Sequence, residues 1–162
     1  MQQSLKSRSD LWLNYLSEGI AFKWINIMML DDETHTYLGI SEEGIWVVGS
    51  NRGLRKLDSI YNGFFGLPML KYDRIEFILK LKNAILNLGI PLVIIKTFPF
   101  DQIVQAGIGE GGRYIEPILN WIDGGYPMSD TIANALLEKN LNVSCVKKYE
   151  EKRLEEILGE KI

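Results

Sequence analysis

Clustered carboxylates are the first residues in this chain that could carry chemistry. Asp31, Asp32 and Glu33 are consecutive, and carboxylate oxygens are the ligands that hard cations such as Mg²⁺ prefer. Asp31 and Asp32 are therefore the predicted metal ligands, and no other cofactor is expected. The alternative is a plain acidic turn, because Asp is common in turns.

The single histidine and the single cysteine limit other chemistry. His35 is the only histidine, which excludes sites with several histidine ligands and leaves it as the one possible member of a histidine-based triad. Its neighbours Thr34 and Thr36 instead favour a solvated strand residue. Cys145 excludes an intramolecular disulfide, and apolar neighbours favour a half-buried structural thiol.

A glycine-rich segment has the spacing G-x-G-x-x-G, formed by Gly107, Gly109 and Gly112. Such a segment can hold the phosphates of a cofactor at the start of a helix. A dinucleotide fold requires a strand immediately before the glycines, however, and residues 101–106 have a poor strand pattern. A connector between two parts of the chain is the alternative.

Residues 51–69 form a predicted loop that combines cations with aromatic rings. Arg52, Arg55 and Lys56 are its basic group, and Tyr61, Phe64 and Phe65 are interleaved with glycines. Cations of this kind can bind phosphates while the rings stack on bases. A surface loop whose rings fold back onto the core is the alternative.

The segment 129–162 predicts two amphipathic helices joined by a short turn, as in a helix-turn-helix DNA-binding unit. Ile132, Ala133, Leu136 and Leu137 would be buried in the first helix, and Val143, Val146, Tyr149, Leu154 and Ile157 in the second. The exposed cations of the second helix would be Lys147, Lys148, Lys152 and Arg153. A plain helical hairpin, packed on the sheet or against another subunit, is the alternative.

Charge argues for local rather than global attraction to nucleic acid. The formal net charge is -3, and residues 101–162 carry 11 Asp and Glu against 7 Lys and Arg. Sequence-independent affinity depends largely on phosphate neutralisation, so binding would require a local basic patch.

The order of elements predicts an α+β fold with a mixed four-stranded sheet. Ser9 and Gly19 would begin and end a helix over 10–16, and residues 21–30, 34–40 and 44–50 would form an antiparallel meander. A helix over 73–88, with an Asp73 to Glu76 capping box, would lead to a parallel strand over 92–98. Helices over 113–122 and 129–162 complete a single compact domain, in which residues 1–100 form the core and residues 101–162 a helical appendage.

The order helix, three strands, helix, strand resembles the core of restriction-endonuclease-like nucleases. That resemblance implies a Mg²⁺-dependent nuclease with an acid on the second strand and an acid-x-lysine pair on the third. Here residues 34–40 contain no carboxylate, and Glu43 has no lysine two positions on. The site would have to use Asp31 or Asp32 with Glu43, Glu76 and Lys80. The order also resembles part of an acetyltransferase core, but residues 52–55 lack the second glycine of that family.

The leading hypothesis is a small nucleic-acid-binding protein without catalytic activity. Its binding residues would be Arg52, Arg55, Lys56, Lys147, Lys148, Lys152 and Arg153. A nuclease and a structural protein that forms homo-oligomers are the alternatives. Apolar runs are too short to cross a membrane, the N-terminus is not signal-like, and one cysteine favours the cytoplasm. Abundant Ile, Leu and Lys favour a heat-adapted source.

Overall fold

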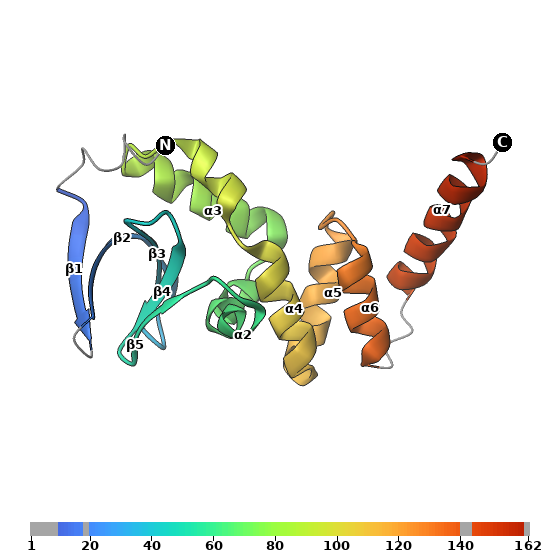
Figure 1. The fold of residues 1–162 in the computed structure, drawn as a ribbon, viewed down its shortest axis with the longest axis horizontal. Helices are drawn as coiled ribbons and strands as arrows, with labels where there is room; N and C mark the ends of the chain where they lie inside the picture. Colours follow the sequence, from blue (N-terminus) through green and yellow to red (C-terminus); the bar gives the residue numbers. More distant parts are fainter. Residues whose placement is uncertain (1–9, 18–19, 140–143, 161–162) are drawn as a thin grey trace.

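A computed structural model describes residues 10–17, 20–139 and 144–160, and it shows an α+β protein. Its first third contains a five-stranded antiparallel sheet whose strands pair in chain order, and helices follow it along the chain (Figure 1). The strands are β1 (Trp12–Ser17), β2 (Ile20–Asp31), β3 (Thr36–Ser41), β4 (Trp46–Ser50) and β5 (Gly53–Lys56). The α+β class is therefore confirmed.

The two faces of the sheet bury different sets of side chains because residues alternate along each strand. Ile25, Ile40 and Trp46 are opposite one another across β2, β3 and β4, and all three are buried in the main core. The other face curls around Trp24, whose ring lies against Gly39 and Gly49. The curl also brings the Tyr15 hydroxyl of β1 within 3.2 Å of the Leu54 amide of β5, from which it accepts a hydrogen bond.

Gly39 is needed because the backbone of β3 approaches both β2 and the Trp24 ring. A Cβ at this position would collide with the Ile25 carbonyl oxygen and lie 2.6 Å from Trp24 Cε3. We expect Gly39→Ala to destabilise the protein by about 1–3 kcal/mol, the usual cost of overpacking. Gly109→Ala is the matched control: a Cβ there meets nothing within 4 Å, so removal of a helical glycine should stabilise by about 0.5–1 kcal/mol. Urea unfolding of both variants checks this, and equal stabilities would contradict it.

Helical segments cover the core face of the sheet and continue as far as Glu160. In chain order they are α2 (Ile60–Gly63), η1 (Phe64–Lys71), α3 (Arg74–Asn87), η2 (Leu92–Thr97), α4 (Phe100–Glu110), η3 (Gly112–Tyr114), α5 (Ile115–Asp123), α6 (Asp130–Glu138) and α7 (Ser144–Glu160), where η marks a 3₁₀ helix. No helix among the described residues is both long and apolar enough to cross a bilayer.

The predicted helix over 73–88 is confirmed as α3. Its apolar face carries Phe77, Leu81 and Ile85, which are fully buried. Tyr72 stacks on Phe77 with ring centroids 6.3 Å apart, as a hydrophobic staple requires. The capping box does not form, because the Asp73 side chain makes no capping hydrogen bond.

Three predictions about the sheet are wrong. Residues 12–17 form strand β1 instead of a helix, because they pair antiparallel with β2; Ser9 and Gly19 lie outside the described residues. Residues 92–97 form the 3₁₀ helix η2, in which Leu92 and Val93 are exposed, so the predicted parallel strand and mixed sheet are absent from the described chain. The predicted loop over 51–69 contains the fifth strand, α2 and η1.

The helical nature of the C-terminal part is confirmed in outline. The Ser129 hydroxyl caps α6 by accepting from the Ile132 amide, and Ile132, Ala133 and Leu136 are buried as predicted. Val146 of α7 is fully buried as well. The predicted burial of Leu137, Leu154 and Ile157 is wrong, since all three are exposed, and Val143 lies outside the described residues.

Candidate functional site

A groove lined by three arginines is the strongest candidate for a functional site. It has a volume of about 670 Å³ and lies between the β4–β5 edge of the sheet, η1 and η3. We call it the arginine groove. Its arginines are Arg52, Arg55 and Arg113, its hydroxyl groups include those of Thr34, Thr36 and Ser50, and its aromatic rings are Phe64, Phe65 and Tyr114.

Strand alternation decides which cations of the predicted basic loop reach the groove. Arg55 is opposite Val48 and Lys56 opposite Val47, so the two neighbours point to opposite faces of the sheet. Arg55 lines the groove, with its guanidinium 5.7 Å from the centre of the Phe65 ring. Lys56 instead forms an ion pair of 2.9 Å with Glu43 and lies 5.7 Å from the Phe22 ring centre. The structure therefore separates Lys56 from Arg52 and Arg55.

Arg113, which the sequence reasoning missed, reaches the groove because of the two glycines before it. Gly111 and Gly112 have φ values of 66° and 52°, a left-handed backbone that glycine adopts without strain. This turn ends α4 and starts η3, which presents Arg113 and Tyr114 to the groove. The guanidinium of Arg113 donates to the Tyr114 hydroxyl at 2.8 Å and lies 4.9 Å from the Tyr114 ring centre.

The glycine motif does not lie between a strand and a helix, as a dinucleotide site requires. Gly107 and Gly109 are inside α4, and Gly112 begins η3. Gly107 allows close helix packing, since a Cβ there would come within 2.7 Å of Ile118 Cδ1. The arrangement therefore gives no support to the predicted cofactor role of Gly107, Gly109 and Gly112.

The arginine groove carries positive charge because three arginines and no carboxylate are among its lining residues. Arg55 donates only to the Leu54 carbonyl at 3.3 Å, and none of the three arginines forms an ion pair with a described residue. Each guanidinium has five N–H donors, so most of the donors in the groove remain available to an anion. The groove can therefore bind phosphate groups.

Asp31 is next to this groove in the chain but is not among its lining residues, and its negative charge is already paired with a cation. Its carboxylate accepts from the Thr34 hydroxyl at 2.8 Å and forms an ion pair of 3.2 Å with Lys71. The Thr34 hydrogen bond, followed by Lys71, holds the pKa of Asp31 below its ordinary value of 3.8. The Thr34 hydroxyl is also 2.7 Å from that of Thr36, which places the hydroxyls of both groove threonines next to each other.

The lowered pKa of Asp31 predicts a specific dependence of stability on pH. A carboxylate with a depressed pKa stabilises the folded protein above its unfolded pKa, and the contribution is lost as the pH falls through the folded pKa. We expect Asp31→Asn to lower the melting temperature at about pH 7 and to differ less from the parent protein at about pH 3, below the ordinary pKa of an aspartate. Thermal melts at the two pH values measure this. A difference that is the same at both would contradict the assignment.

The predicted metal ligands do not come together as a cluster. No group of three or more His, Cys, Asp or Glu side chains among the described residues is placed to hold a metal ion. Asp31 ends β2, and Asp32 and Glu33 begin the turn that follows, in which the Glu33 amide donates to Asp31 Oδ1 at 3.3 Å. Of the other predicted catalytic residues, Glu43 pairs with Lys56, Lys80 lies 5.5 Å from the Tyr72 ring centre, and Glu76 is in the first turn of α3.

The four cations of α7 lie outside the arginine groove and do not form one basic surface. Arg153 pairs with Asp130 of α6, which also accepts from the Tyr149 hydroxyl at 2.5 Å. Successive helix positions turn by about 100°, so Glu151 and Glu155 fall between Lys147 and Lys148 around the axis, with Lys152 just beyond. These glutamates reduce the positive potential around the lysines.

The half-buried position of Cys145 matches the predicted structural thiol. Burial raises the pKa of its thiol, which disfavours the thiolate that acts as a nucleophile.

Comparison of the chain with protein-family models, curated protein sequences and solved structures finds no match.

Proposed function

We propose that this protein binds single-stranded nucleic acid in the arginine groove and that it does so without cleaving the strand. One observation carries the proposal: Arg113 is far along the chain from Arg52 and Arg55, yet all three line one groove together with aromatic rings and no carboxylate. A guanidinium group can donate two parallel hydrogen bonds to the oxygens of one phosphate, and aromatic rings stack on bases. The groove supplies both kinds of group.

The aromatic rings favour single strands over duplexes. The Phe64 side chain is 44% exposed, so a base can reach its face. Unstacked bases in a single strand are free to stack on such rings, whereas bases in a duplex already stack on each other. Exposed Tyr61, in α2 directly before η1, lies in the same segment and could extend the stacking surface.

The charge of the chain explains why binding should be local and weak. With a formal net charge of -3, the protein has no overall attraction for a polyanion. Three arginine contacts to phosphate predict that log K falls with log salt with a slope of about -2, from about 0.7 per contact for a single strand. A dissociation constant of about 10⁻⁴ to 10⁻⁶ M is then expected, as for other nonspecific binding.

Fluorescence anisotropy of a labelled oligothymidine, titrated with the protein over a series of salt concentrations, tests the proposal. We expect binding with the slope given above, weaker binding to a duplex of equal length, and an intact strand after incubation with Mg²⁺. Lack of binding at low salt, affinity that does not change with salt, or preference for the duplex would each contradict it.

A further inference from the structure

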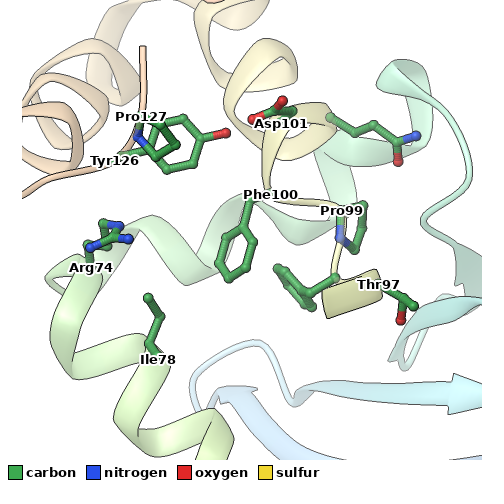
Figure 2. A pocket seen from close by; sticks show the side chains of 10 residues that line it. Arg74, Ile78, Thr97, Pro99, Phe100, Asp101, Tyr126 and Pro127 are labelled. Atoms are coloured by element: carbon green, nitrogen blue, oxygen red, sulfur yellow. The ribbon is translucent and has the colours of Figure 1, made fainter. Parts of the chain in front are cut away.

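A second pocket lies on a different part of the molecule, between α3, the start of α4 and the turn after α5. It has a volume of about 560 Å³, within the usual range for sites that bind small molecules. We call it the α3–α4 pocket. Apolar side chains form much of its wall, namely Ile78, Phe98, Pro99, Phe100 and Pro127, and Figure 2 shows the Phe100 ring as part of this wall.

Two buried polar atoms on residues that line this pocket have no hydrogen-bond partner among the described residues. They are the Tyr126 hydroxyl and Gln102 Oε1, and both residues line the pocket. Tyr126 is only 6% exposed. Figure 2 shows its hydroxyl directed into the pocket, toward the wall that carries Asp101. A buried polar group without a partner is costly, so these two atoms point to a ligand that supplies the missing hydrogen bonds.

Among the described residues, the other buried polar atoms of aromatic rings have partners, which makes the exception informative. Trp121 Nε1 donates to the Tyr72 carbonyl at 2.8 Å, and Trp46 Nε1 donates to the Thr97 hydroxyl at 2.9 Å. Tyr126 packs next to Trp121, with ring centroids 6.4 Å apart. The fold therefore places polar atoms of buried rings opposite partners, except where they face the α3–α4 pocket.

The pocket also carries one charge of each sign. Arg74 lies on its α3 wall, and its only described hydrogen bond is a long one of 3.5 Å to the Gly124 carbonyl. Asp101 is exposed in the first turn of α4 and forms no ion pair with a described residue. Figure 2 shows the two side chains on different walls of the pocket, so each can pair with a different charged group of one ligand.

We propose that the α3–α4 pocket binds a small aromatic molecule that carries both an ammonium group and a carboxylate, the chemistry of a free aromatic amino acid. The ammonium group pairs with Asp101, the carboxylate pairs with Arg74, and the ring packs among Ile78, Phe98 and Phe100. A donor on the ligand reaches Gln102 Oε1, and the Tyr126 hydroxyl completes the polar contacts. This proposal is independent of the arginine groove.

Isothermal titration calorimetry with four related indoles tests the charge assignment. The probes are L-tryptophan, which carries both charges, tryptamine with the amine alone, indole-3-acetate with the acid alone, and uncharged indole. We expect L-tryptophan to bind with a dissociation constant below about 1 mM and each singly charged probe to bind at least about tenfold more weakly. Equal affinity for all four, or no binding of L-tryptophan, would overturn the proposal.

Variants separate ligand binding from structural effects. Tyr126→Phe removes only the hydroxyl and should weaken L-tryptophan binding about five- to tenfold, while the free protein melts at the same or a higher temperature because a buried unpaired group is gone. Asp101→Asn should remove the preference for L-tryptophan over indole-3-acetate. Tyr61→Phe, on an 85% exposed ring outside the pocket, is the control and should change nothing. Unchanged binding by Tyr126→Phe, as for a hydroxyl that is merely hydrated, would count against the proposal.

Discussion

Replacing Arg52, Arg55 and Arg113 together with alanine is expected to weaken binding of a single-stranded oligonucleotide about 100-fold. An exposed ion pair contributes up to about 1 kcal/mol, and 1.4 kcal/mol corresponds to a tenfold change in affinity. Three such contacts therefore account for roughly two orders of magnitude. The slope of log K against log salt should fall to near zero at the same time. Anisotropy titrations of parent and variant measure both quantities.

The matched control is a triple variant that removes the same number of positive charges from α7. It combines Lys147→Ala, Lys148→Ala and Lys152→Ala. All three lysines are exposed, so the fold should tolerate the change. We expect a loss of less than about threefold, due only to the altered net charge. If this variant loses binding and the arginine variant keeps it, the terminal helix pair binds the nucleic acid and the groove does not.

Phe77→Ala is expected to destabilise the protein by about 3–5 kcal/mol, the usual cost of removing a buried aromatic ring. Phe77 is fully buried, and its ring lies within 6.3 Å of the ring centroids of Tyr72, Phe98, Phe100 and Trp121. This aromatic cluster joins α3 to the start of α4 and to α5. Truncation would leave a cavity where these elements meet.

Leu79→Ala on the same helix is the control, because Leu79 is 54% exposed and its loss should change stability by less than about 0.5 kcal/mol. Denaturant unfolding of both variants gives the comparison. Similar losses of stability in the two variants would show that the cluster around Phe77 is not the core of the helical layer.

Elements with a regular pattern and clear ends could be predicted from the sequence. The apolar spacing from Ile78 to Leu88 and the stop at Gly89 predicted α3, and a long apolar run followed by two strand-like runs predicted β2, β3 and β4. The segment 92–98 misled because a short apolar run has no periodicity that separates a strand from a helical turn. Whether such a run becomes a strand depends on pairing with residues that are distant in the sequence. Residues 12–17 form a strand because they pair with β2.

The candidate site could be predicted only where its residues lie close together in the sequence. Arg52 and Arg55 were singled out from their density in the sequence, and both line the arginine groove. Lys56 was grouped with them because the four-residue strand β5 was not recognised, so its alternation could not be used. Arg113 was missed because it is far away in sequence, although the pair Gly111–Gly112 before it marked a sharp turn that could present a side chain.

The most direct test of the central claim is to locate the nucleic acid on the protein by NMR. The guanidinium Nε–H signals of Arg52, Arg55 and Arg113 and the backbone amides of η1, η3 and α7 are recorded during titration with an oligothymidine. We predict that the largest shifts fall on the three arginines and on residues of η1 and η3. Shifts concentrated in α7, or shifts absent from the arginine groove, would contradict the account.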